Sequence, residues 1–278
     1  MRFEKMTFFL GLGPAKTGTT WLHDYLEKHP EFLSSKPKEL HFFSALHHKR
    51  NSARFEQRVR DNMAKLAEDP ERNSSPAKQA ALAAFAERLE MAEHPARYIE
   101  AFRRRAKPEH KAFGELSPSY CALTEEGYRM VKAQHPRVRL MICLRDPIDR
   151  VDAVLRHMWN NGNRMPYDRF VDATLPTRLE YHNMFYDKLL DTIFGVFDES
   201  EVRVQFFEDM FTQPTLDTIA DFIGIGRRPA DFDLKLAHSP PAESMTRAHR
   251  ERLSELLAPT YAAIRTRFGD RVPDSWAM

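Results

Sequence analysis

The fold is decided by the stretch Phe8-Phe9-Leu10-Gly11-Leu12-Gly13-Pro14-Ala15-Lys16-Thr17-Gly18-Thr19-Thr20-Trp21-Leu22. An apolar run is followed by a glycine-bearing loop and then by the start of a helix. A loop of this kind turns backbone N–H groups toward an anion, and the positive N-terminal end of the helix adds to the attraction. The stretch therefore predicts a phosphate-type ligand at the carboxyl end of a buried strand.

The composition narrows the class of protein. The 278 residues are 42% hydrophobic, which is enough for a sizeable core, and we expect one domain over residues 1–278. The 42 Lys and Arg nearly balance the 40 Asp and Glu, which argues against a nucleic-acid-binding protein. Cys121 and Cys143 stand in apolar contexts and predict buried, reduced thiols in a cytoplasmic protein. No apolar run is long enough to span a membrane.

Apolar runs alternate with helical patterns along the chain. The predicted strands are 7–12, 32–33, 111–116, 138–144 and 202–207. The predicted helices are 18–29, 124–134, 147–160, 178–197, 214–223, 246–257 and 259–268. This alternation predicts right-handed crossovers and an α/β fold, with a central parallel sheet flanked by helices. Ligands of such sheets bind beyond the carboxyl ends of the strands, where the glycine-bearing loop lies.

Residues 50–106 are predicted to be a helical insertion into this pattern. They are rich in Arg, Glu and Ala, and a third helix is expected at 96–105. Apolar residues recur at helical spacing at Phe55, Val59, Met63 and Leu66, and again at Leu82, Phe85 and Leu89. We find no internal repeat and no sign of a separate domain.

The glycine-bearing loop departs from the nucleotide-binding pattern G-x-x-x-x-G-K-[ST]. Residues 13–20 keep both glycines and the final threonine, but Thr19 stands at the lysine position and the lysine is Lys16. A kinase or triphosphatase needs that lysine on the β- and γ-phosphates. We expect Lys16 to address the terminal anion of a shorter, diphosphate-like ligand, with Thr19 and Thr20 on the inner phosphate. A kinase of the P-loop superfamily remains the second enzymatic reading.

Arg145 is the candidate for a second anion site. It follows the most apolar strand, and Asp146 and Pro147 then suit a helix start. An arginine at this place can bind a phosphate through two nitrogens while the helix end contributes N–H groups. The alternative is a structural ion pair with Asp149 or Glu115.

Four segments together resemble the sulfotransferase family, and the resemblance covers nearly the whole chain. Residues 16–21 (KTGTTW) resemble that family's loop for the 5′-phosphosulfate of 3′-phosphoadenosine 5′-phosphosulfate (PAPS). Residues 144–150 (LRDPIDR) are similar to its second motif, whose first arginine holds the 3′-phosphate. Residues 38–43 (KELHFF) and 114–120 (GELSPSY) are similar to segments of carbohydrate sulfotransferases. The resemblance implies a P-loop-like α/β domain.

The resemblance also implies an activity and its residues. A sulfuryl group would move from PAPS to a hydroxyl, on a carbohydrate or glycosylated metabolite, leaving 3′-phosphoadenosine 5′-phosphate (PAP), without a metal. Glu39 would be the general base, His41 would orient the acceptor, and Lys16 would stabilise the leaving phosphate. From local sequence alone Glu39 reads equally well as a solvated loop residue, and Lys38 as surface charge or an anion contact. The implied donor-binding residues are Pro14, Ala15, Lys16, Thr17, Gly18, Thr19, Thr20, Trp21, Arg145 and, on the tail, Arg247.

Two positions depart from the family pattern. Ala153 stands where a serine usually binds the 3′-phosphate, and Asp152 beside it would repel a phosphate unless it is turned away. Leu116 stands where the carbohydrate branch has a lysine. These departures keep open a degenerate, non-catalytic nucleotide-binding protein.

Overall fold

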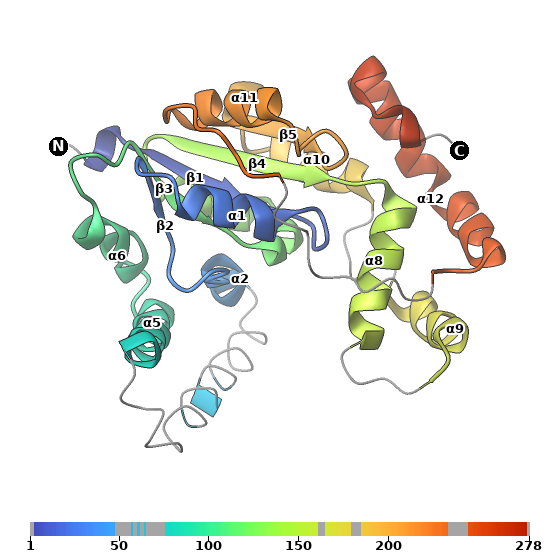
Figure 1. The fold of residues 1–278 in the computed structure, drawn as a ribbon, viewed down its shortest axis with the longest axis horizontal. Coiled ribbons are helices and arrows are strands. Elements are labelled where there is room, and N and C mark those ends of the chain that lie inside the picture. Colours follow the sequence, from blue (N-terminus) through green and yellow to red (C-terminus); the bar gives the residue numbers. More distant parts are fainter. Residues whose placement is uncertain are drawn as a thin grey trace.

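Five parallel strands form the centre of the computed structural model, in the order β2-β3-β1-β4-β5 (Figure 1). The model describes residues 3–47, 57, 60–61, 64, 76–160, 165–178, 185–232 and 244–276. The strands are β1 Thr7–Gly11, β2 Phe32–Ser34, β3 Ala112–Leu116, β4 Val138–Leu144 and β5 Val202–Phe206. Each of the predicted strands is thereby confirmed. Their shared direction brings all five carboxyl ends to one edge of the sheet.

The central strand β1 is buried on both faces. Phe8, Phe9 and Leu10 are fully buried, as expected for a parallel strand covered on both sides. The pairing with β3 sets Phe9 beside Gly114, where a Cβ would lie 1.7 Å from the Phe9 carbonyl oxygen. Only glycine allows the two strands to approach this closely.

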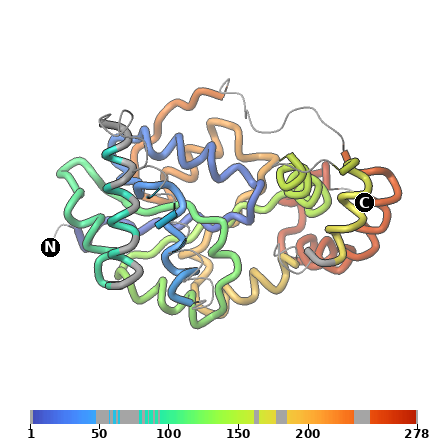
Figure 2. Tube along the Cα trace, turned by 90° about the horizontal axis from the view of Figure 1, so that it is seen from below, coloured from blue at the N-terminus to red at the C-terminus, as the bar shows by residue number. Residues whose placement is uncertain are grey.

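Helices cover both faces of the sheet. They are α1 Thr19–Glu27, α2 Phe42–His47, α5 Pro76–Glu93, α6 Arg97–Arg105, α7 Glu125–Lys132, α8 Pro147–Asn160, α9 Tyr167–Arg178, α10 Tyr186–Phe194, α11 Gln213–Ile223 and α12 Arg247–Phe268. Phe9, on one face, packs in a core cluster with α1 and α11. Phe8 and Leu10, on the other face, pack in a cluster that includes α6, α7 and α10. At the end of the molecule away from the N-terminus, α8 contacts α9 and α12 (Figure 2).

The insertion is helical where the structure describes it. Helices α5 and α6 occupy its second half, and α6 confirms the helix expected at 96–105. The expected apolar positions Phe55, Val59, Met63 and Leu66 lie outside the described residues. None of the described helices is both long and apolar enough to cross a membrane.

The helix predicted over 178–197 is confirmed over Tyr186–Phe194 (α10) and is wrong at Phe185 and beyond Phe194. Arg178 is the last residue of α9, which the apolar pattern did not predict, and Phe185 has non-helical dihedrals (φ −84°, ψ 80°) before α10 begins. The buried stripe of α10 explains its extent, because it spans only two turns of the helix. That stripe consists of Tyr186, Leu189, Leu190 and Ile193.

The break predicted between 246–257 and 259–268 is also wrong, because α12 continues through Pro259. A proline inside a helix frees the carbonyl four residues earlier, which here belongs to Glu255. Both residues are exposed, so water can satisfy that carbonyl. The buried stripe of Leu253, Leu257, Tyr261 and Ile264 runs past the proline and holds the two halves in one line.

Candidate active site

The loop between β1 and α1 has the geometry of an anion cradle. Gly13, Lys16 and Gly18 have positive φ values of 87°, 70° and 80°. The buried Thr17 hydroxyl donates to the Pro14 carbonyl at 2.7 Å and closes the loop on itself. Gly18 caps α1 without any side-chain hydrogen bond, so the first N–H groups of the helix are left for a ligand. The Thr17 hydroxyl therefore has a structural role within the loop.

Arg145 lies beside this loop, because β4 pairs directly with β1. Its Nη1 donates to the Lys16 carbonyl at 3.2 Å, and its guanidinium lies 4.6 Å from the centre of the Phe207 ring. The two carboxylates that were its alternative partners are engaged elsewhere. Asp149 pairs with Arg250 at 2.7 Å, and Glu115 is enclosed by hydrogen-bond donors of other residues.

The segment after β2 brings Glu39 to the same edge of the sheet. Lys38 Nζ donates both to Glu39 Oε1 at 2.8 Å and to the Thr20 hydroxyl of α1 at 2.9 Å. Partial burial lowers the pKa of Lys16, and the positive charges of Arg145 and Lys38 lower it further, while Glu39 raises it. The predicted base and the predicted loop lysine are therefore close enough to interact. Lys38, which the sequence left undecided, joins them.

His41 is held by Ser119, which is itself positioned by Ser44. Its Nδ1 lies 2.6 Å from the Ser119 hydroxyl, which accepts a hydrogen bond from Ser44 at 3.0 Å. The other ring nitrogen, Nε2, lies 3.7 Å from Glu39 Oε2. This arrangement fixes the imidazole with one nitrogen toward the carboxylate.

Sequence reasoning missed the role of Glu115. This carboxylate is fully buried in β3, and burial raises its pKa, although four hydrogen bonds oppose that shift. The donors are Leu40 N, Ser117 Oγ, Tyr98 Oη and Tyr120 Oη. The available signal was a charged residue inside an otherwise apolar strand, since such a group needs buried partners.

An aromatic cluster extends from α1 toward Arg145. The Trp21 ring stacks on Phe232 with centroids 5.8 Å apart and meets Phe211 edge-on at 5.2 Å. Phe211 in turn contacts Phe207, the ring beneath Arg145, at 5.1 Å. These rings form one apolar group beside the phosphate-type loop, and Phe232 is 40% exposed.

The carboxylate of Asp152 is turned away from the loop. It accepts hydrogen bonds from the Tyr167 hydroxyl at 2.8 Å and from Met245 N at 3.1 Å, and it pairs with Arg156 at 3.3 Å. Its charge is therefore matched within the α8–α9 region. The neighbouring Ala153 is buried.

Leu116 is 1% exposed and packs in the core under β1, so this position carries no polar group at the site.

The tail arginines occupy different places. Arg247 pairs with Glu251 on its own helix, and its side chain is 92% exposed. Arg250 instead reaches α8 and pairs with Asp149. The structure therefore places Arg250, one turn further along α12, nearer to the helix that Arg145 precedes. The assignment of Arg247 to the donor stays a prediction.

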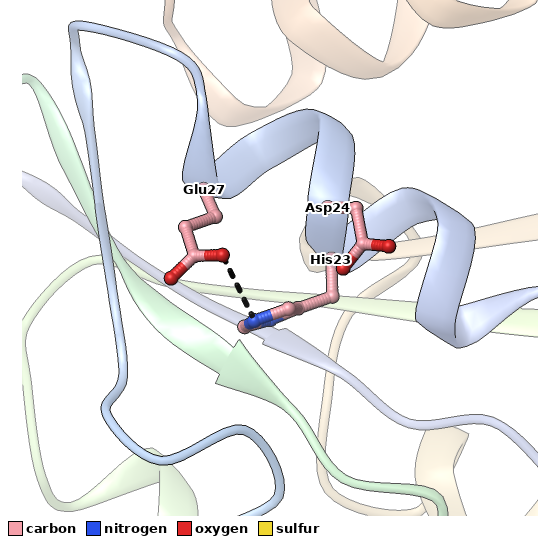
Figure 3. A group of neighbouring side chains, drawn as sticks. All are labelled: His23, Asp24 and Glu27. Atoms are coloured by element: carbon pink, nitrogen blue, oxygen red, sulfur yellow. Dashed lines mark ion pairs between the residues drawn. The ribbon is translucent and has the colours of Figure 1, made fainter. Parts of the chain in front are cut away.

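One group of side chains among the described residues could hold a metal ion. His23, Asp24 and Glu27 on α1 offer ligand atoms within 4.8 Å of one another (Figure 3). Burial lowers the pKa of His23, and its Nε2 lies 4.0 Å from Glu27 Oε2. Asp24 and Glu27 are exposed, and acidic groups at a helix surface commonly lack an ion.

Comparison with known proteins gives one matching family model and several similar solved structures. A family model described as "Sulfotransferase family" matches residues 9–229. A sulfotransferase from Alicyclobacillus acidocaldarius is 21% identical, with 96% of this chain and 97% of that chain covered and a TM-score of 0.65. The sulfotransferase domain from the Synechococcus PCC 7002 olefin synthase is 15% identical, with 96% and 95% covered and a TM-score of 0.54. Sulfotransferase STF9 from Mycobacterium avium is 14% identical, with 95% and 77% covered and a TM-score of 0.50.

At these identities the solved structures establish the α/β fold, and the family model establishes the family. No curated protein sequence matches the chain.

Proposed function

The chain belongs to the sulfotransferase family and is a PAPS-dependent enzyme, and on this premise we propose that its acceptor is a hydroxyl of a carbohydrate or glycosylated metabolite. The observation that carries the proposal is the grouping of Lys16, Lys38 and Arg145 at one loop, with Arg145 bonded to the Lys16 carbonyl and Lys38 paired with the carboxylate of Glu39. Three cations suit a phosphosulfate, and one carboxylate suits removal of a proton from a hydroxyl. The Glu-x-His pair of residues 39–41, which resembles that of carbohydrate sulfotransferases, supports this acceptor class.

The residues present fit the donor. The uncapped start of α1 and the Lys16 ammonium suit the 5′-phosphosulfate, and the Arg145 guanidinium suits the 3′-phosphate. Gly18 also packs closely against the segment that follows β5, because a Cβ there would lie 2.2 Å from Met210 Cε. When bound, PAPS supplies the sulfuryl group and a phosphate leaving group. Lys16 would stabilise the negative charge that develops on the departing oxygen.

Glu39 would take the proton of the acceptor hydroxyl. Lys38 holds Oε1 of this carboxylate, so Oε2, on the side of His41, is the oxygen available to the acceptor. His41, fixed by Ser119, would hold the acceptor oxygen in line for attack. Lys38 would link this base to the phosphate-type loop through Thr20. Base and leaving-group cation would thus be aligned before the acceptor arrives.

A donor-consumption screen against sugars, glycolipids, phenols and peptides tests the proposal. We expect turnover with carbohydrate hydroxyls above all. Turnover confined to phenols or peptides would refute the carbohydrate assignment. No transfer to any acceptor, despite tight PAP binding, would favour the non-catalytic reading. Tighter calorimetric binding of a nucleoside triphosphate than of PAP would favour the kinase.

A further inference from the structure

The backbone that carries the proposed base is strained. Glu39 and His41 both have left-handed backbones, with φ values of 59° and 55°, although neither is glycine. Such conformations are unfavourable for residues with a Cβ and persist only where the surroundings impose them. Leu40, between them, is 1% exposed, so its peptide groups cannot rely on water. Something in the fold must therefore hold this short segment.

Both polar backbone groups of Leu40 are bound by charged side chains. Its N–H donates to Glu115 Oε2 at 2.8 Å, and its carbonyl accepts from Arg88 Nε at 2.8 Å. Glu115 belongs to β3, and Arg88 belongs to α5 in the insertion. Partial burial lowers the pKa of Arg88 to about 10, and the charges of Glu115, Tyr120 and Glu39 oppose this shift. The Leu40 peptide is thus gripped from two elements that are distant in sequence.

Glu115 is itself immobilised. The hydroxyls of Tyr98 and Tyr120 donate to Oε1 at 2.8 and 2.7 Å, and Ser117 donates to Oε2 at 2.5 Å. Tyr98 lies on α6, so the insertion contributes to both sides of the grip. A carboxylate with its oxygens so fully engaged is a fixed acceptor for the Leu40 N–H.

We propose that Glu115 and Arg88 are positioning residues that hold the strained Leu40 peptide and thereby aim Glu39 and His41 at the acceptor. The proposal rests on the proposed function of Glu39 as the base. It gives the helical insertion a role in catalysis, because α5 supplies Arg88 and α6 supplies Tyr98. Neither Glu115 nor Arg88 would touch the substrate.

Arg88→Met tests the hydrogen bond to the Leu40 carbonyl, because methionine keeps an apolar side chain and removes the hydrogen-bond donor. We expect kcat to fall about tenfold or more, with PAP affinity and the midpoint of thermal unfolding nearly unchanged. Arg88→Lys, which keeps one donor for the Leu40 carbonyl, should recover much of the lost kcat. Arg104→Met is the matched control, since Arg104 joins α6 to Glu87 of α5 at 3.7 Å, and it should leave kcat unchanged. Wild-type kcat in Arg88→Met, or an equal loss in Arg104→Met, would overturn the proposal.

A second arm separates this inference from the assignment of the base. In a Glu39→Gln background, Arg88→Met should cause a much smaller further loss of kcat, because only His41 remains to be aimed. An equally large loss of kcat in that background would mean that Arg88 acts elsewhere, and it would overturn the proposed positioning role. Wild-type turnover of Glu39→Gln alone would instead refute the base.

If Arg88→Met does not fold, the Glu115→Gln variant tests the same proposal. Glutamine has one acceptor oxygen where glutamate has two, so it cannot bind all four hydrogen-bond donors in the same way. We therefore expect kcat to fall and PAP affinity to stay unchanged. Wild-type kcat in that variant would overturn the proposal.

Discussion

At the scale of single residues, the site is a small set of charges held by neighbouring backbone and hydroxyl groups. Lys16 stands at a left-handed position in the loop, and its carbonyl accepts from Arg145. Lys38 is fixed between Thr20 and Glu39. Charges that are held before reaction need little rearrangement when charge develops in the transition state. Each of these side chains is therefore a separate test of the proposed chemistry.

Lys16→Ala should nearly abolish sulfuryl transfer and leave the protein folded. The loss of one cation at a developing oxyanion costs about 10²–10³-fold in turnover, and the change removes no core packing. Donor turnover and thermal unfolding measure the two effects. Lys111→Ala is the matched control, because Lys111 pairs with Glu31 at the other end of β3 and should keep full activity. Normal turnover by Lys16→Ala would show that the loop has another role.

Glu39→Gln should lower turnover by about 10²-fold, because glutamine cannot accept the proton of the acceptor hydroxyl. Affinity for PAP, measured by calorimetry, should stay close to that of the wild type. Glu27→Gln, which changes an exposed carboxylate on α1, should have no such effect. Wild-type-like turnover of the Glu39 variant would remove this residue as the base.

Arg145→Ala should weaken binding of PAP by about 10–100-fold, as expected for the loss of a charged hydrogen bond worth about 1.5–3 kcal/mol. Binding of adenosine 5′-phosphate, which lacks the 3′-phosphate, should weaken far less. Calorimetric titration of both ligands gives the comparison. Arg139→Ala, at the start of β4, should affect neither. Equal weakening of the two ligands by Arg145→Ala would argue against a 3′-phosphate site.

At the scale of elements, the junction of the loop with α1 depends on Gly18. This residue has φ 80° and ψ 9°, and a Cβ there would lie 2.2 Å from Met210 Cε of the segment that follows β5. The conformation starts α1 without a side-chain cap and so leaves its N–H groups open. A side chain at this position would disturb both the helix start and the space beside it.

Gly18→Ala should lower the free energy of unfolding by about 1–2 kcal/mol through left-handed strain alone, and it should weaken PAP binding as well. Gly224→Ala is the matched control, because Gly224 has nearly the same dihedrals (φ 83°, ψ 32°) and only an ordinary contact at 3.7 Å. Urea unfolding should show a similar loss in both variants, whereas only Gly18→Ala should affect PAP in calorimetry. Unchanged PAP affinity in Gly18→Ala would argue against binding of the donor at this loop.

At the scale of the whole molecule, residues that follow each of the five parallel strands contribute to the site. The groups that follow the strands in chain order are Lys16 after β1, Glu39 after β2, Ser119 after β3, Arg145 after β4 and Phe207 after β5. Between them these segments lie more than 190 residues apart in sequence. The shared direction of the strands is what brings them to one edge.

The fold also makes global stability depend on pH through buried histidines. His135 packs against the rings of Phe3 and Phe113, and burial lowers its pKa. Below the ordinary value of about 6.5, the unfolded chain therefore binds a proton that the folded protein does not. Stability due to this residue should be lost as pH falls below that value.

Urea unfolding of the wild type and of His135→Gln between pH 5 and pH 8 measures this contribution. The unfolding free energy of the wild type, relative to the variant, should rise with pH up to about 6.5 and then level off. A difference between the two proteins that is constant with pH would contradict the assignment.

The amino-acid sequence was enough to predict the five strands, the glycine-bearing loop and the helix start that follows Arg145. Strand β4 and helix α8 lie where the apolar run and the Asp146-Pro147 start predicted them. These features follow from local chemistry, because burial pattern, glycine placement and helix-start residues act within a few positions.

The packed fold alone shows how the proposed base is held and which charged side chains lie together. Glu115 binds Leu40 from 75 residues away, and Lys38 reaches Thr20 across two elements. The turning away of Asp152 likewise depends on Tyr167 and Met245, which lie on other segments. A buried charge takes whichever partners the packed fold brings within hydrogen-bond distance, and local sequence carries no record of that choice.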